Sequence, residues 1–251
     1  MALLDCLRQH SYAVTPGLCL LCHQETRRSL DLCQACESEL PKLGNSCDYC
    51  AEPLATDASG ICAQCLRAPP PFSAALCVFE YAYPVDHLLQ RFKDSGQQVA
   101  GYVLTRLAAV NLKETLNRLP PEHLLITSVP LHWRKTRKRG FNQSQLIADW
   151  LNTSTDLSTE HTLLKRHRDS ISQRSLDAMS RRHHLRGAFS VSKPELIKNK
   201  TVLLVDDVIT TTSTVSEISR TLLEHGATDV IVIALARTPR NAAMKTGTRT
   251  T

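Results

Sequence analysis

The 251-residue chain contains no long run of apolar residues. Residues 1–15 lack the apolar stretch of a signal peptide, and no later window approaches the roughly 18 apolar residues that a membrane-spanning helix needs. We therefore expect a cytoplasmic protein. A hydrophobic content of 42% with 22% charged residues is typical of globular proteins, and the length allows one ordinary domain with a small additional module.

Large apolar residues are also scarce in residues 1–71, which contain most of the ten cysteines. Eight of the cysteines form four CxxC pairs, namely Cys19 and Cys22, Cys33 and Cys36, Cys47 and Cys50, and Cys62 and Cys65. Two CxxC turns can supply four thiolates to one tetrahedral zinc ion in a closed structural site. The pattern predicts two structural zinc ions, which supply folding energy that so small a core lacks.

Two other interpretations of these cysteines are a disulfide framework and redox-active CxxC motifs. A reducing compartment disfavours the first, and four evenly spaced pairs exceed what a thiol oxidoreductase needs. Pairing in sequence order would make two tandem ribbons, although the nearly equal gaps between pairs leave an interleaved arrangement open. We expect Cys6 and Cys77 to be buried apolar residues, and we do not expect His10 or His23 to be ligands.

Three consecutive prolines, residues 69–71, end this module because they form a stiff connector that neither helix nor sheet accommodates. Strands then alternate with helices over residues 72–240. The apolar patterns predict strands at 72–81, 123–130, 202–205 and 230–236 and helices at 85–92, 97–116, 141–151 and 216–226. This alternation predicts an α/β domain with a mainly parallel sheet, followed by a tail over residues 241–251.

Residues 202–215 (VLLVDDVITTTSTV) place two acids and a hydroxyl-rich loop at the end of an apolar strand. The acids are Asp206 and Asp207, and the loop residues are Thr210, Thr211, Thr212, Ser213 and Thr214. Such a loop at a helix amino terminus can bind phosphate, whereas neighbouring acids suit ribose hydroxyls or magnesium. We interpret the segment as a sugar-phosphate site. An acidic cluster of the response-regulator type and a threonine-rich helix cap are the alternatives.

Positive charge is concentrated in two segments. Residues 134–139 hold five cations and no acid, and residues 165–186 hold seven cations against two acids. The cations that we single out are Arg134, Lys135, Arg137, Lys138, Arg139, Arg181, Arg182 and Arg186. They favour a polyanionic partner such as pyrophosphate or nucleic acid, although two solvated loops would look the same.

The segment 202–215 resembles the 5-phosphoribosyl-1-pyrophosphate (PRPP) motif of type I phosphoribosyltransferases. The four CxxC pairs, the proline joint, LLQRFKDSG, VPLHWRKTRKRGFNQS and SQRSL with RRHHLRGAF are similar, in the same order, to the ComF/GntX family. The resemblance implies a double zinc ribbon followed by a type I phosphoribosyltransferase domain.

The resemblance also implies roles for single residues. Asp206 and Asp207 would bind the ribose hydroxyls of PRPP, accompanied by magnesium, and residues 210–214 would bind its 5-phosphate. The basic segment would face pyrophosphate, and a hood over the site would include Gln173, Arg181, Gly187 and Phe189. The chain departs from the family pattern in two places, with Thr212 where the loop normally has glycine and His184 where asparagine is usual.

The family resemblance implies a role in natural competence, in which imported DNA arrives as a single strand. Trp133 and Phe141, beside the cations of residues 134–139, suit base stacking, although a packing role for Trp133 at the strand end is an equal alternative. The expected partners are single-stranded DNA, PRPP, and a competence helicase or membrane DNA-uptake channel. The rival hypothesis is an active phosphoribosyltransferase in nucleotide or cofactor salvage, and a third makes PRPP an allosteric signal.

Overall fold

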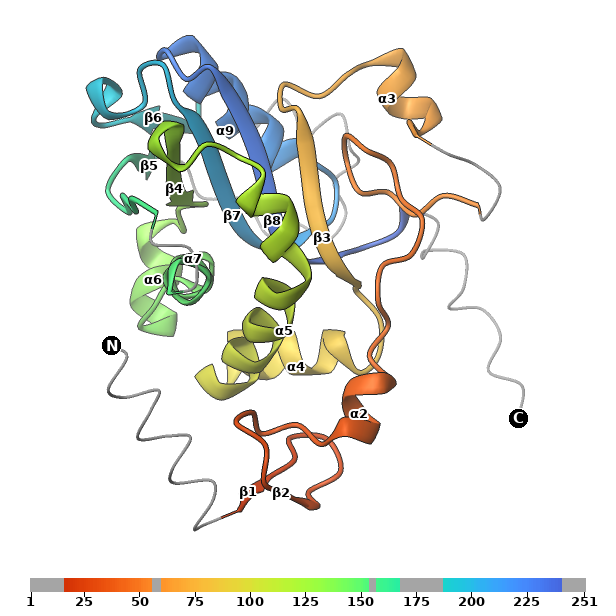
Figure 1. The fold of residues 1–251 in the computed structure, drawn as a ribbon. Helices are drawn as coiled ribbons and strands as arrows, with labels where there is room; N and C mark the ends of the chain where they lie inside the picture. Colours follow the sequence, from red (N-terminus) through yellow and green to blue (C-terminus); the bar gives the residue numbers. More distant parts are fainter. Residues whose placement is uncertain (1–15, 56–59, 154–156, 168–186, 241–251) are drawn as a thin grey trace.

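A four-stranded parallel sheet with the strand order β3-β8-β7-β4 forms the centre of the protein (Figure 1). The computed structural model describes residues 16–55, 60–153, 157–167 and 187–240. The sheet consists of β3 (Ala74–Glu80), β4 (Leu124–Ser128), β7 (Thr201–Ile209) and β8 (Asp229–Arg237). The helices that cover it are α4 (Val85–Asp94), α5 (Gln98–Asn117), α7 (Gln143–Asn152) and α9 (Ser213–Glu224).

The alternation of side chains along each strand creates two cores, one on each face of the sheet. On β7, Leu203 and Val205 belong to the core that also contains the apolar residues of α4, α5 and α7. Val202 and Leu204 belong to the other core, which α9 covers. The fold is therefore a three-layer α/β arrangement, and the predicted mainly parallel sheet and its helices are confirmed.

The strand β7 is longer than the sequence pattern indicated. We expected the chain to leave the sheet after Val205, but β7 continues to Ile209, and Asp206 lies opposite Ala234 of β8. The neighbouring β4 ends at Ser128, opposite Val205. The two acids thus lie within β7. They come after its last residue that pairs with β4, so they lie just beyond the carboxyl end of β4.

The cysteine-rich segment contacts the sheet domain at several points along its length. Its first half contains β1 (Gly17–Leu18), β2 (Glu25–Thr26) and α2 (Gln34–Ser38), and its second half contains α3 (Ala63–Arg67). Figure 1 shows α2 and α3 at opposite ends of the molecule. Between them, Lys42 forms an antiparallel bridge with Phe79 of β3. This pairing covers the outer edge of β3, which would otherwise expose unpaired backbone groups.

The basic segment folds as a helix, whereas the alternative interpretation of its charge was a solvated loop. The helix α6 (Trp133–Arg139) begins after His132 and ends at Gly140, whose φ of 82° is the left-handed conformation that glycine tolerates. A short pair of strands, β5 (Leu164–Arg166) and β6 (Phe189–Val191), lies outside the main sheet. Among the described residues, no helix is long and apolar enough to span a bilayer.

Candidate functional site

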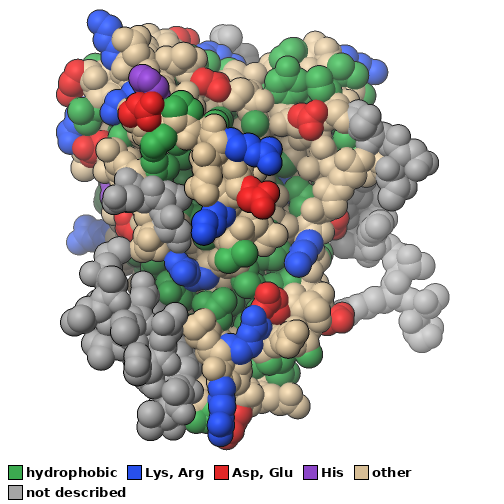
Figure 2. Space-filling model, viewed as in Figure 1, with side chains coloured by type: hydrophobic (Ala, Val, Ile, Leu, Met, Phe, Trp, Pro, Cys, Tyr) green, Lys and Arg blue, Asp and Glu red, His purple; other side chains and the backbone are tan. Residues whose placement is uncertain are grey.

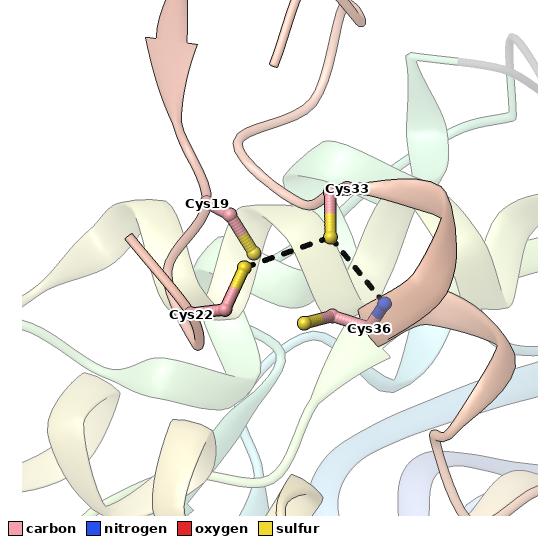
Figure 3. Close-up of side chains that lie close together, drawn as sticks. All are labelled: Cys19, Cys22, Cys33 and Cys36. Atoms are coloured by element: carbon pink, nitrogen blue, oxygen red, sulfur yellow. Dashed lines mark hydrogen bonds between the residues drawn. The ribbon is translucent and has the colours of Figure 1, made fainter. Parts of the chain in front are cut away.

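The first four CxxC cysteines converge on one point (Figure 3). Cys19 and Cys22 lie between β1 and β2, whereas Cys33 and Cys36 lie at the start of α2. Their Sγ atoms all lie within 4.8 Å of one another. Cys33 also caps α2, because its Sγ accepts a hydrogen bond from the backbone N–H of Cys36 at 3.4 Å. We call these four residues the first cluster.

The remaining four form a second cluster with the same spacing of sulfur atoms. Cys47, Cys50, Cys62 and Cys65 are all buried, and the backbone N–H of Cys62 donates to Cys47 Sγ at 3.2 Å. The first CxxC pair therefore shares a cluster with the second, and the third with the fourth. The tandem arrangement is confirmed, and the interleaved alternative is wrong.

The chemistry of the clusters fits zinc. Burial would raise the pKa of Cys19, but backbone N–H groups of Cys22 and Cys33 outweigh it and lower that pKa to about 6. Burial and the neighbouring thiols raise the pKa of Cys36. Four thiolates this close repel one another unless a cation lies between them, and a closed tetrahedral site with four cysteine ligands suits structural Zn²⁺. Each cluster is thus suited to one zinc ion.

The other candidate ligands stay outside the clusters where the structure describes them. Neither His23 nor Cys77 joins a cluster among the described residues, as predicted. Cys77 lies in β3, and burial raises the pKa of its thiol to about 12, which makes it an unreactive packing residue. Cys6 and His10 lie outside the described residues.

Asp206 and Asp207 lie together on β7 in contact with two helices. Ser144 of α7 donates from its hydroxyl to Asp206 Oδ1 at 2.9 Å, and the backbone N–H of Asp207 donates to the same oxygen at 2.9 Å. Burial and then the charge of Asp207 raise the pKa of Asp206 to about 7, although both hydrogen bonds oppose the rise. Asp206 is therefore partly protonated near neutral pH unless a ligand supplies positive charge.

Lys93 of α4 supplies part of that positive charge. Its Nζ lies 2.8 Å from Asp207 Oδ2, and both side chains are mostly buried. Burial would lower the pKa of Lys93, but Asp207 and then Asp206 outweigh it, so the pKa is raised and the amine stays charged. A ligand cation at Asp207 would have to compete with this ammonium group.

The hydroxyl loop adjoins the acids, as predicted. Asp206 lines a small cavity of about 40 Å³ together with four loop residues, Thr210, Thr211, Thr212 and Thr214. Ser213 is not among its lining residues, and its backbone N–H donates to the carbonyl of Thr211. Thr212 precedes α9 with φ 12° and makes no side-chain capping bond. The first turn of α9 thus directs its N–H groups toward this loop.

The basic helix α6 forms one side of an open groove of about 690 Å³. Trp133, Thr136 and Arg137 line it from α6, and Lys165, Arg166 and His167 line it from β5 and the residue after it. Trp133 is 59% exposed, so the packing alternative is wrong, and the guanidinium of Arg134 lies 5.3 Å from the centre of its rings. The groove combines cations with an exposed aromatic ring.

The segment between α6 and α7 joins the basic helix to the end of β4 and to α7, the helix that carries Ser144. Asn142 caps α7 by accepting from the Ser144 N–H at 3.1 Å, and its amide donates to the carbonyl of Val129 at 3.0 Å. Arg139 donates to Gln143 Oε1 at 3.2 Å. The amide nitrogen of Gln143 is buried and has no hydrogen-bond partner among the described residues. Phe141 packs on Phe92 at 5.6 Å, so we assign it to the core rather than to the groove.

The second basic segment is described only at its ends. Gln173, Arg181, Arg182, His184 and Arg186 lie outside the described residues, so their predicted roles stay predictions. Two residues of the expected hood are described. The backbone N–H of Gly187 donates to Glu217 of α9 at 3.1 Å, and the ring of Phe189 lies under Arg166 at 5.3 Å.

Lys93 and Ser144, which contact the acids from distant helices, were not predicted from the sequence. Lys93 is part of LLQRFKDSG and Ser144 of FNQS, two segments that carried only a family resemblance. Arg237 at the end of β8 was also missed. It is fully buried and contacts both the hydroxyl loop and the segment after Cys50. The sequence signal that could have identified Arg237 is a single arginine at the end of an otherwise apolar strand.

Comparisons with family models match both parts of the chain. Residues 11–66 match the double zinc ribbon domain, and residues 139–249 match the phosphoribosyl transferase domain. Among solved structures, a hypoxanthine phosphoribosyltransferase from Staphylococcus aureus overlaps 54% of this chain and 64% of its own, with 14% identity and a TM-score of 0.36.

Curated relatives match over most of their length. DNA utilization protein YhgH of Escherichia coli K12 is 33% identical over 227 residues, which are 89% of this chain and 98% of the relative. Competence protein F of Haemophilus influenzae is 35% identical over 82% of this chain and 90% of its own. Competence protein ComFC of Bacillus subtilis is 26% identical over 83% and 90%. The chain belongs to the ComF/YhgH family, in which a double zinc ribbon is joined to a phosphoribosyltransferase domain.

Proposed function

We propose that this protein handles single-stranded DNA during DNA uptake in the cytoplasm, and that the groove beside α6 binds the strand. The observation that carries the proposal is the lining of this groove, where exposed Trp133 lies beside Arg137, Lys165 and Arg166. The relatives named for competence and DNA utilization support the same role.

The groove has the two properties that single-strand binding requires. Cations along its walls attract the phosphate backbone, and an exposed ring offers a surface on which any base can stack. On the face seen in Figure 2, the Lys and Arg side chains are interspersed with Asp and Glu. An open groove with one aromatic platform favours binding of a strand without strong sequence preference.

Fluorescence anisotropy of a labelled oligothymidylate, measured over a range of salt concentrations, tests this proposal. Arg137→Gln with Lys165→Gln should weaken binding and reduce the salt slope by about 0.7 for each phosphate that the variant no longer neutralises. The matched control, Lys113→Gln with Arg118→Gln, removes two exposed cations at and just after the end of α5 and should change neither. Equal affinity and slope for both double variants would refute the groove as the DNA site.

Trp133→Ala separates stacking from charge in the same assay. We expect a decrease of about 1–3 kcal/mol in binding free energy with an unchanged salt slope, because the ring contacts bases rather than phosphates. Wild-type affinity in this variant would show that the exposed ring takes no part.

A second candidate function is the binding of PRPP with magnesium, and the observation that favours it is the contact of Asp206 with the hydroxyl loop in one cavity. The free carboxylate oxygens suit ribose hydroxyls or Mg²⁺, which prefers oxygen ligands. When the hydroxyls or the cation of the ligand bind Asp207, the ammonium group of Lys93 would leave this carboxylate and pair with a phosphate of the ligand. The buried amide of Gln143 offers a further unused donor.

Calorimetric titration with PRPP and magnesium tests this second function. Asp207→Asn should abolish or strongly weaken binding, because it removes a charge that the ligand cation needs. Release of pyrophosphate with some acceptor base would indicate an active phosphoribosyltransferase. Binding without turnover would make PRPP an effector, in which case saturating PRPP must change DNA affinity by the same factor as DNA changes PRPP affinity. The absence of any heat of binding would exclude both.

A further inference from the structure

Arg237, the last residue of β8, is 0% exposed although it is a cation. Its Nη1 donates to the carbonyl oxygens of Ile209 at 3.0 Å and Thr210 at 2.5 Å, where the hydroxyl loop begins. Its Nε donates to the Cys50 carbonyl at 3.1 Å, and its Nη2 lies 2.5 Å from Glu52 Oε2. One side chain therefore joins the second cluster to the hydroxyl loop.

The charge partner of Arg237 is part of the second cluster's turn. The backbone carbonyl of Glu52 accepts from the Cys47 N–H at 2.8 Å, so the position of Glu52 depends on the fold of the cysteine turn. The carboxylate of Glu52 also accepts from the Arg240 N–H at 2.8 Å. A buried guanidinium is tolerated only when it is paired and fully hydrogen-bonded. If the turn moved, Arg237 would lose its partner and the loop carbonyls would lose their donor.

The first cluster lacks such a connection among the described residues. It contacts the sheet domain through α4, where Arg91 Nη1 donates to the Leu20 carbonyl at 2.8 Å. In Figure 1 its helix α2 lies beside α4, at the opposite end of the molecule from α3. The two clusters have the same ligands and different neighbours, so each serves as a control for the other.

We propose that the second cluster fixes the shape of the hydroxyl loop through Glu52 and Arg237, so that the ligand affinity of the loop depends on whether this cluster is intact. The part concerning affinity rests on the phosphate-binding role proposed above. Arg237 acts as a positioning residue, since it touches the loop carbonyls and reaches any ligand only through them. The coupling must act in both directions, so a ligand held by the loop also stabilises the second cluster.

Hydrogen exchange of the zinc-loaded full chain, read by mass spectrometry, tests the coupling without any ligand. The informative peptide covers residues 208–216, which include the Ser213 and Ser216 amides that donate to the carbonyls of Thr211 and Thr212. Cys62→Ser, in the second cluster, should increase exchange in this peptide several-fold because local opening becomes easier. Cys22→Ser, in the first cluster, should leave it unchanged.

A milder pair of variants keeps the test decisive if a cysteine variant fails to fold. Glu52→Gln neutralises the partner of Arg237 and should also increase exchange in residues 208–216. Its matched control is Glu37→Gln, which neutralises the partner of Arg28 in the first half of the cysteine-rich segment. Exchange in residues 230–233, inside β8, reports whether the sheet is intact. Wild-type exchange of the loop in both Cys62→Ser and Glu52→Gln would overturn the proposal.

Ribose 5-phosphate, which does not carry the metal-chelating pyrophosphate, tests the affinity arm. It should tighten zinc binding by the second cluster about five-fold or more, measured by equilibrium competition with a chelator, and leave the first cluster unaffected. Glu52→Gln should abolish this effect. If wild-type protein does not bind ribose 5-phosphate, the phosphate-binding function fails, while the exchange experiment still decides the coupling. If it binds and the zinc affinity of both clusters stays the same, the reciprocal coupling is wrong.

Discussion

Asp206 couples the state of the candidate site to pH. Burial and the charge of Asp207 raise its pKa from 3.8 to about 7, so the folded protein keeps a proton that the unfolded chain releases. The stability due to this proton is fully present below about pH 4 and disappears as the pH rises through about 7. We expect Asp206→Asn to flatten the stability curve in this window by roughly 1 kcal/mol or more.

Urea unfolding of wild type and Asp206→Asn between about pH 4 and pH 8 measures this effect. Two parallel curves would contradict a raised pKa at Asp206. Ligand binding should show the opposite trend, because a cation at the acid pair competes with the proton and binds better as the pH rises.

At the same scale, the acids and the hydroxyl loop could be singled out from the sequence because they are adjacent along the chain, and their role in binding stays a prediction. The order of strand, acids, hydroxyls and helix is visible in residues 202–215. Lys93 and Ser144 could not be predicted in this way, since they reach the acids from α4 and α7. Contacts between elements that are distant along the chain can be identified only when the three-dimensional fold is known.

Among the elements, the contact between α4 and α5 supports the helix that carries Lys93. Gly101 of α5 lies against Phe92 of α4, and a Cβ at this glycine would lie 2.7 Å from the phenylalanine ring. We expect Gly101→Ala to destabilise the fold by about 1–3 kcal/mol, because this contact has no room for another methyl group. Denaturant unfolding gives the change in midpoint.

Gly44→Ala is the matched control, because nothing lies within 4 Å of a Cβ at that position. It should unfold at or near the wild-type midpoint. Equal midpoints for Gly101→Ala and Gly44→Ala would show that the two helices separate easily, which would weaken the role of α4 as a fixed support for Lys93.

The helices that cover the sheet were predictable because their apolar residues recur with helical spacing. The helix α6 was not, since it buries none of its residues and therefore lacks an apolar pattern. Its boundaries come instead from local signals, namely the cap at His132 and the left-handed Gly140. The length of β7 was missed for a related reason, because Asp206 and Asp207 interrupt an otherwise apolar strand.

In the molecule as a whole, the two clusters differ in how far solvent reaches them. Cys22 of the first cluster is exposed and Cys33 and Cys36 are partly exposed, whereas all four cysteines of the second cluster are buried. We expect a thiol-alkylating reagent, added with a chelator, to label the first cluster well before the second, because thiolate reactivity requires access. Mass spectrometry of labelled peptides over time measures the order, and simultaneous labelling would contradict it.

The double zinc ribbon and the sheet domain were both predicted from the sequence, yet their relation was not. Evenly spaced cysteines do not determine which pairs share a metal, and the structure was needed to separate the tandem arrangement from the interleaved one. The proline run at residues 69–71 suggested a simple joint. Instead, Lys42 and Glu52 place the cysteine-rich segment in contact with β3 and β8.

The position of Arg237 in β8, which follows β3, β4 and β7 along the chain, also sets an order for folding during translation. The ribosome releases residues 47–65 and β3 long before β8. Within the described part of the sheet β3 pairs with β8, and Glu52 meets its buried partner only when Arg237 has emerged. A nascent chain that stops before residue 229 therefore lacks the strand that pairs with β3 and that supplies Arg237 to Glu52. The second ribbon and the edge of the sheet both depend on β8, so they reach their final state together once that strand has been made.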